Sequence, residues 1–159
     1  MTVKYSPITK VSIDHSDLQF NEKRDVIRKR LAEKYFEDNE IIELGEDVDP
    51  IFRRRDIYEN INSSENYFFL NYDNNDLLRD IEVHYCDKVQ VFDIIFDFND
   101  QVDRIGLELM RYSENNTVNT GEYFFADLQI VIMSKYKMGG EGSTIGYFYC
   151  SSDITHLVV

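Results

Sequence analysis

Histidine and cysteine are the residue types in this chain that could ligate a metal or act as a base and a nucleophile. None of the three histidines stands in a zinc-binding spacing or beside a Cys-x-x-Cys pair: His15, His84 and His156. On a strand, His84 and Cys86 would share one face, but two ligands are too few for a structural zinc site. Asp87 follows Cys86, and its negative charge raises the pKa of that thiol and makes it a poor nucleophile. We therefore expect no metal and no catalytic cysteine, and we interpret Cys86 and Cys150 as small, reduced core residues.

The 30 acidic residues could supply the paired carboxylates of a glycosidase, but nothing in their spacing selects two of them. The turn-forming run from Asp73 to Asp76 does not match the calcium-loop pattern Asp-x-Asp/Asn-x-Asp/Asn-Gly, and no Glu stands at its twelfth position. The glycine-rich run at 139–142 lacks the Lys-Ser/Thr of a phosphate-binding loop and precedes a strand-like segment. The sequence therefore favours a protein that is not an enzyme and needs no cofactor.

The composition indicates a single folded domain over residues 1–159. Hydrophobic residues make up 43% of the chain, and its 159 residues suffice for a core without disulfides or metals. The formal net charge of −13 would repel a phosphate backbone, so we expect no nucleic-acid partner. Apolar runs stay at about five residues or fewer, far below the roughly 20 that span a bilayer, and no leader-like segment opens the chain. We therefore expect a cytoplasmic protein with no membrane association.

Two segments carry helical periodicity, and the dipeptide Phe-Asn introduces each of them. Asn21 is placed to cap a helix over residues 22–35, whose apolar residues recur at i, i+4 and i+8. Asn99 is placed to cap a second helix over residues 100–112, with apolar residues at i, i+3 and i+7. The two dipeptides lie 78 residues apart, which suggests corresponding places in two related halves.

Strand-like segments flank both helices. They combine Tyr, Phe, Ile and Val at alternating positions with Asn-, Asp- or Gly-rich turns, as paired antiparallel strands require. Two of them share the pattern Ile-x-x-x-Tyr-Cys, which ends at Cys86 and again at Cys150. The segments predicted as strands cover residues 8–13, 67–72 and 81–86 in the first half and residues 89–96, 121–125, 128–134 and 145–150 in the second.

The repeated order of these elements predicts an internal duplication of a β-α-β-β unit. Its halves would be residues 1–87 and 88–159, with the polar stretch 36–66 as a longer connection in the first half. Strands outnumber helices and the connections are short, so we expect an α+β fold in which one mostly antiparallel sheet carries both helices on one face. This layout resembles the β-lactamase-inhibitor-like and TATA-binding-protein-like folds.

Charge is distributed unevenly along the chain. Residues 37–49 hold seven acids and no base, and the triplet Arg53-Arg54-Arg55 follows, whose acidic surroundings favour local ion pairs. Residues 72–103 hold nine acids against two bases, and no neighbouring segment of the sequence cancels this excess. Clustered carboxylates beside aromatic residues suit the capture of a basic protein. We predict a partner-binding surface in residues 72–103, with the stretch 37–49 as the next candidate. The residues predicted to form that surface are Asp73, Asp76, Asp80, Glu82 and Asp97.

The alternation of the strand at 81–86 orients part of this surface. Glu82 would point to one side of the sheet, and Ile81, Val83 and Tyr85 to the other. We expect the helices to cover the apolar side, which leaves Glu82 and its neighbours to a partner.

The size, the acidity and the Tyr-, Asp- and Asn-rich hairpins of this chain resemble the immunity proteins of bacterial contact-dependent inhibition and related polymorphic toxin systems. The stretch from Asn71 to Asp73 and on through residues 77–83 is similar to one in small bacterial domains of that kind. The resemblance implies a cytoplasmic protein that binds one cognate toxin, often a nuclease, and blocks its active site or substrate surface. A nucleic-acid-binding toxin tends to be basic, in agreement with the charge of −13. The resemblance assigns no functional residue, and the alternative is a non-catalytic ligand-binding or structural domain.

Overall fold

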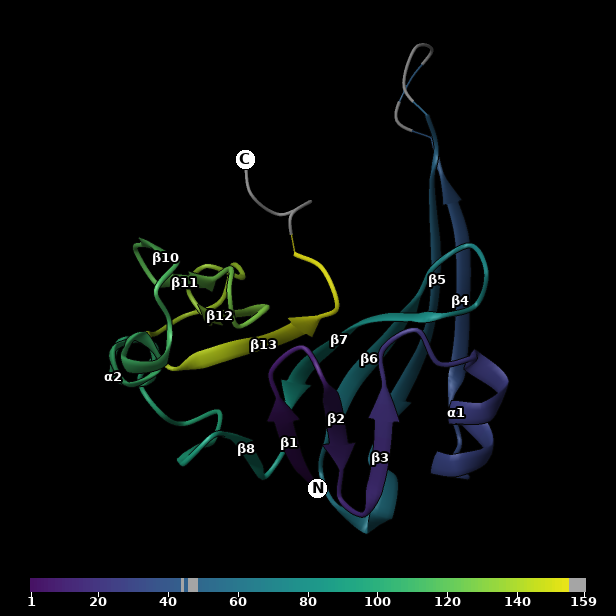
Figure 1. The fold of residues 1–159 in the computed structure, drawn as a ribbon, viewed down its shortest axis with the longest axis horizontal. Coiled ribbons are helices and arrows are strands. Elements are labelled where there is room, and N and C mark those ends of the chain that lie inside the picture. The colour runs from purple at the N-terminus through teal and green to yellow at the C-terminus, as the bar shows by residue number, and fades with distance from the viewer. Residues whose placement is uncertain (44, 46–48, 155–159) are drawn as a thin grey trace.

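The computed structural model describes residues 1–43, 45 and 49–154 of the chain (Figure 1). In that part of the chain the protein has an α+β fold with two α-helices and two mostly antiparallel sheets, of five and eight strands. The helices of the described residues are too short and too polar to cross a bilayer. The elements in chain order are β1 (Thr2–Ser6), β2 (Lys10–Ile13), β3 (Ser16–Gln19), α1 (Arg24–Leu31), β4 (Phe36–Ile42), β5 (Ile51–Glu59), η1 (Ile61–Ser63), β6 (Tyr67–Tyr72), β7 (Leu78–Tyr85), β8 (Lys88–Val91), β9 (Ile94–Phe96), α2 (Val102–Leu109), η2 (Met110–Tyr112), β10 (Asn116–Asn119), β11 (Glu122–Phe125), β12 (Ile130–Ser134) and β13 (Ile145–Ser151).

The smaller sheet has the strand order β3-β2-β1-β8-β9, and the larger sheet has the order β10-β11-β12-β13-β7-β6-β5-β4. Neighbouring strands run antiparallel except β1 and β8, which run parallel with Val3 opposite Val89. At the centre of the larger sheet β7 and β13 pair antiparallel, with Ile81 opposite Cys150. Each α-helix is thus followed by a four-stranded antiparallel meander, β4–β7 after α1 and β10–β13 after α2.

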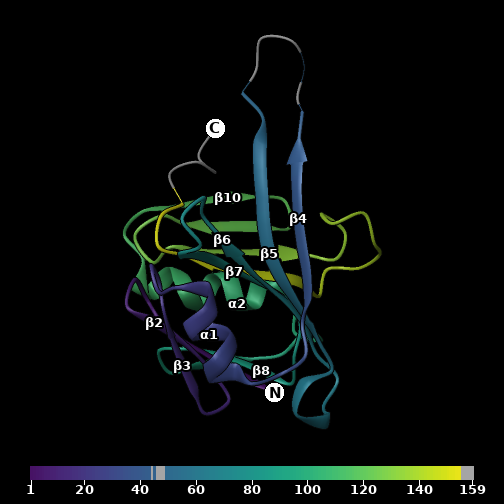
Figure 2. The ribbon, with the colours of Figure 1, turned by 90° about the vertical axis from the view of Figure 1, so that its right-hand side faces the viewer.

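One apolar core joins both sheets and both helices. Val3 of the smaller sheet, Ile27 of α1 and Ile105 of α2 are fully buried in the same cluster as Leu70 and Phe148 of the larger sheet. Figure 2 shows the helices and the smaller sheet on one side of the larger sheet. The inner face of the larger sheet therefore contributes to the core. Its other face, which we call the outer face, is not covered by the helices or by the smaller sheet.

Both helices begin later in the sequence than their periodicity indicates. α1 begins at Arg24, because Asn21 adopts a left-handed conformation with a φ of 64° and donates its backbone N–H to the carbonyl of Leu78. α2 begins at Val102, and Asn99 lies in the turn before it. The predictions that Asn21 and Asn99 cap the helices are therefore wrong, and both helices are shorter than predicted.

The positions of most strands are predicted correctly, but their assembly into one sheet is not. Strands predicted at 67–72, 81–86, 121–125, 128–134 and 145–150 are confirmed as β6, β7, β11, β12 and β13. The segment predicted at 8–13 contains β2, and the one predicted at 89–96 overlaps β8 and contains β9. The single predicted sheet is wrong, since the strands form two sheets. The predicted β-α-β-β unit is also wrong in its strand number, because the stretch 36–66 contains β4 and β5, and β10 precedes β11.

Candidate functional site

The β4–β5 hairpin projects from the body of the protein, as Figures 1 and 2 show. β5 pairs with β6 only as far as Arg55, which lies opposite Asn71, whereas β4 and β5 stay paired up to Ile42 opposite Ile51. Four residue pairs therefore extend past the sheet as a two-stranded ribbon, which we call the arm (residues 39–42 and 51–54). An isolated two-stranded ribbon is marginally stable, so side-chain contacts must support the arm.

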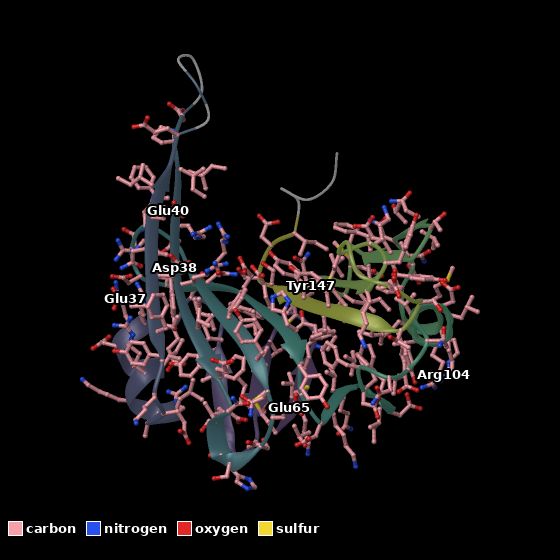
Figure 3. All side chains as sticks on the ribbon, turned by 180° about the vertical axis from the view of Figure 1, so that it is seen from behind. Glu37, Asp38, Glu40, Glu65, Arg104 and Tyr147 are labelled. Carbon is pink, nitrogen blue, oxygen red and sulfur yellow. The ribbon has the colours of Figure 1, made fainter. Side chains whose placement is uncertain are left out.

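Opposite charges connect β4 and β5 in the arm and just below it. Glu40 lies opposite Arg53 in the arm, and Asp38 lies opposite Arg55 below it. Arg53 is ion-paired with Asp38 at 3.2 Å and also with Glu40, and Arg55 is ion-paired with Asp38 at 2.8 Å, so the predicted local pairing of these arginines is confirmed. Figure 3 shows Glu37, Asp38 and Glu40 following one another along β4. Each exposed pair contributes only about 0–1 kcal/mol, so these pairs mainly set the register of the hairpin.

A buried carboxylate clamps the base of the arm to α1. Asp56 accepts hydrogen bonds from Arg24 Nη2 at 2.6 Å and from Arg28 Nε at 2.8 Å. The hydrogen bonds to Asp56 raise the pKa of Arg28, which keeps this guanidinium charged. On the same side of the hairpin, Asp76 Oδ1 in the turn between β6 and β7 lies 2.8 Å from Arg54 Nη2 and 3.4 Å from Arg24 Nη1. Arg24 thus joins Asp56 to Asp76, and this one ion-pair cluster ties the base of the arm to α1 and to the β6–β7 turn.

Large apolar side chains lie exposed on the arm and at its base. Ile41 and Phe52 lie opposite each other and are 61% and 47% exposed, and Ile51 beside them is 51% exposed. At the base, Phe36 is 67% exposed. Apolar residues that gather on a projecting element within a charged rim are typical of a protein-contact surface.

A depression of about 200 Å³ lies where the arm meets the larger sheet. Ile51 and Phe52 line it from the arm, and Asn71, Arg79 and Glu82 line it from the sheet. Small-molecule sites usually measure roughly 300–1,000 Å³, so this depression suits a single side chain of a partner better than a cofactor.

Polar and aromatic side chains continue from this depression across the outer face. Asn71 Nδ2 donates a hydrogen bond to Glu82 Oε1 at 2.6 Å, and His84 Nε2 lies 3.5 Å from Glu82 Oε2. The ring of His84 lies between the rings of Phe69 and Tyr147, with centroid distances of 4.7 Å and 5.5 Å. Burial acts to raise the pKa of Glu82, but the hydrogen bonds from His84 and Asn71 lower it overall. An ionised carboxylate among aromatic rings can receive a basic side chain.

The structure places the five residues predicted to bind a partner in different environments. Asp73 and Asp97 accept backbone N–H groups within turns. Asp76 is ion-paired with two arginines. Asp80 is buried, and its burial raises its pKa although an arginine and an asparagine contact it. Glu82 is half-buried on the outer face, on the opposite side from the buried Ile81 and Val83, as the strand alternation indicates.

The ion pairs of the fold cancel part of the excess negative charge of residues 72–103: four of its nine acids have an arginine partner, and three of these arginines lie outside the segment. Asp80 is moreover no surface residue, since its side chain is 1% exposed. The acids of this segment that have an arginine partner are Asp76, Asp80, Asp93 and Asp100, paired with Arg54, Arg79, Arg111 and Arg104.

The remaining candidates for chemistry lie in structural positions. Cys86 and Cys150 are free and buried, as predicted, and burial raises the pKa of Cys86 to about 12. His84 is half-buried on its strand. Among the described residues, no group of three His, Cys, Asp or Glu side chains is arranged to hold a metal ion. His156 and two of the seven acids in the stretch 37–49, Glu46 and Asp47, lie outside the described residues.

No family model, curated protein or solved structure matches this chain. No residue role is therefore carried over from a relative, and the arm is singled out by its geometry and its surface chemistry.

Sequence reasoning missed the apolar residues of the arm, Ile41, Ile51 and Phe52. The stretch 36–66 looks like a polar connection, because neither face of the arm is buried and no alternation of apolar and polar residues results. One signal was present: the acids at 38 and 40 and the arginines at 53 and 55 have the mirrored spacing of an antiparallel pair.

Proposed function

We propose that this chain is a cytoplasmic immunity-type protein that binds a basic toxin domain and neutralises it by covering its active site or substrate surface. The arm is its main contact element. The observation that carries the proposal is the exposure of Ile41 and Phe52 on a ribbon that projects beyond the sheet. Such side chains add little to the core of their own chain, and a partner that removes them from water would gain binding free energy.

The charge of the protein supports a basic partner. A net charge of −13 accelerates encounter with a positively charged domain and repels nucleic acid, so the protein would compete with the substrate of a nuclease without binding it. In this role it acts by binding alone, with no cofactor, no membrane contact and no catalysis.

The clamp at the base of the arm supports the same role. Asp56, held by Arg24 and Arg28, fixes the arm before any partner arrives. A preformed element loses less conformational entropy on binding than a flexible loop of the same composition.

Coexpression tests the proposal. The chain is produced in a bacterial host together with toxin domains encoded next to its own gene. We expect it to restore growth against one of them and to coelute with that domain as a 1:1 complex. If it restores growth against none of the growth-inhibiting domains, the proposed function is wrong.

A matched pair of variants tests the role of the arm. Ile41→Ser removes an apolar side chain from the arm, and Ile95→Ser removes one that is similarly exposed, at 55%, on β9. We expect the first to weaken toxin binding by at least about tenfold and the second to leave it unchanged, with equal urea midpoints for both. Equal affinities of the two variants would place the contact elsewhere, with Asp73, Glu82 and Asp97 as the next candidates.

We also propose that the chain arose by duplication, with halves at residues 1–87 and 88–159. Two four-stranded meanders that meet at β7 and β13 support this, as does the place of the two Ile-x-x-x-Tyr-Cys segments on those strands. Superposing α1 and β4–β7 on α2 and β10–β13 should align Ile81 with Ile145. A superposition that aligns these residues with different strands would contradict the duplication.

A further inference from the structure

We infer that the free edge of β4 accepts a strand of the partner protein in antiparallel pairing, and that this strand carries basic residues flanked by apolar ones. The inference rests on the proposed function and specifies its contact. β4 is the last strand of the larger sheet and, within the described residues, pairs only with β5. One row of its backbone N–H and C=O groups therefore faces away from the protein, ready for a further strand.

β4 protects its edge only by the charge of its three acids, which repels another acidic strand and admits a basic one. Other edges are kept short, bulged, or interrupted by Lys or Pro. β4 has seven residues, none of them Lys or Pro, and its register with β5 is regular throughout. The other three edge strands, β3, β9 and β10, have only four, three and four residues. The long, regular edge is therefore confined to the strand that forms half of the arm.

The side chains of β4 specify the chemistry of the added strand. Phe36 and Ile41 are exposed near its two ends, and the side chains of Glu37 and Glu40 between them are 44% and 53% exposed. A strand on the free edge would place its residues beside these groups. Apolar residues at its ends and basic residues at its centre are the complementary pattern.

β5 shows the same complementarity inside the protein. It pairs Phe52 with Ile41 and Ile57 with Phe36, and it places three arginines and Asp56 between them, with Asp56 opposite Glu37. The neighbour that β4 already has is therefore apolar at both ends and carries a net positive charge in the middle, and a partner strand of that kind would repeat its pairing on the other edge.

Charge argues against a second copy of this chain as the occupant. Antiparallel pairing of two β4 strands about Asn39 would place Asp38 opposite Glu40 twice. The neighbouring registers, about Asp38 or about Glu40, would place that acid opposite itself. Like charges directly opposite one another destabilise a strand pair, so the edge favours a basic strand over a copy of itself.

Peptide binding to the full chain tests the inference. The probe is the synthetic heptapeptide Ile-Phe-Arg-Arg-Arg-Asp-Ile, which has the sequence of residues 51–57. We expect saturable binding with a Kd of about 1 mM or tighter, and amide NMR shifts centred on β4. The β5–β6 cross-strand contacts should persist, which shows that the peptide adds to the sheet without replacing β5. A peptide with Glu in place of the three Arg should not bind.

Backbone methylation separates strand pairing from attraction between charges. Two further peptides have the side chains of the parent and carry N-methyl groups on alternate residues. In the first peptide the methyl groups lie along one edge of the strand, and in the second they lie along the other edge. We expect one of them to bind at least about tenfold more weakly and the other to bind like the parent, because an added strand pairs through one edge only. No binding of the parent, equal binding of both methylated peptides, or dimers of the free chain held together by β4 would overturn the inference.

A matched pair of chain variants completes the test. Glu40→Lys should weaken peptide binding at least about tenfold, and Glu141→Lys, which makes the same change at an exposed site away from the arm, should not. Unchanged binding by the Glu40 variant would count against the inference. If the peptide does not bind but the chain still neutralises its toxin, only the strand pairing is overturned. If the peptide binds but the chain neutralises no toxin, the proposed function is overturned.

Discussion

Arg24 Nη2 lies 2.6 Å from Asp56 Oδ1, and both side chains are withdrawn from water, with 5% and 0% of their surfaces exposed. Arg28 approaches the same carboxylate from one turn further along α1. Two guanidinium groups of the helix thus meet one buried acid of β5, directly below the arm. A buried ion pair of this kind adds little net stability over an apolar contact, but it is costly to break on one side only.

Asp56→Asn is therefore expected to lower the free energy of unfolding by about 3–5 kcal/mol, because it removes the buried anion that Arg24 and Arg28 share and leaves them only the more exposed carboxylates of Asp76 and Glu37. Asp17→Asn, which removes the exposed partner of Lys10, should change it by less than about 1 kcal/mol. Urea denaturation of both variants at pH 7 measures the difference. Similar values for the two would show that the clamp does not hold α1 against β5.

Gly106→Ala is expected to destabilise the protein by about 1–3 kcal/mol, although alanine normally favours a helix. The ring of Tyr123 on β11 occupies the space that a Cβ at Gly106 would need. Leu107→Ala, one residue further along α2 and 62% exposed, should stay within about 0.5 kcal/mol of the unaltered protein. A stabilised Gly106 variant in thermal denaturation would mean that α2 does not pack on β11 this closely.

Asp80→Asn is expected to leave the free energy of unfolding at pH 7 equal or higher. Burial raises the pKa of Asp80 above its unfolded value, so the ionised carboxylate lowers the stability of the fold at neutral pH. That loss disappears as the pH falls through the raised pKa and the carboxylate gains its proton. The difference between the variant and the unaltered protein should therefore shrink toward acidic pH. Urea titrations at several pH values check this, and a clear loss of stability at pH 7 would show that the ion pair with Arg79 outweighs the burial.

The thiols are expected to be unreactive in the folded protein at pH 8. Cys86 is buried with a pKa of about 12, so almost none of it is thiolate, and burial also raises the pKa of Cys150 well above its usual value. A thiol-reactive chromogenic reagent should label two thiols in protein denatured without reductant. In the native protein it should label both thiols far more slowly. Fast labelling of the native protein, or fewer than two thiols after denaturation, would contradict this.

The strands at the centre of the larger sheet could be recognised from the sequence. β6 is confirmed at its predicted limits, and β13 agrees within one residue, since both are runs of aromatic and other apolar residues bounded by turn-forming segments. The helix starts could not be placed in this way. Asn21 has the composition of a cap, but its backbone N–H is taken by Leu78 in the larger sheet, a contact between residues far apart in the chain.

The sequence by itself determined the α+β class, most of the strands and the burial of both cysteines, because these follow from local alternation and apolar content. Tertiary structure alone decided which charges are free and where apolar groups remain exposed. Asp76 is neutralised by Arg54, which lies 22 residues away in the chain. The arm exposes Ile41 and Phe52 because β6 stops pairing with β5 at Arg55. A carboxylate is screened by the cations within about 4 Å of it, and an apolar side chain is buried only where another element covers it, so both properties belong to contacts that the order of residues does not display.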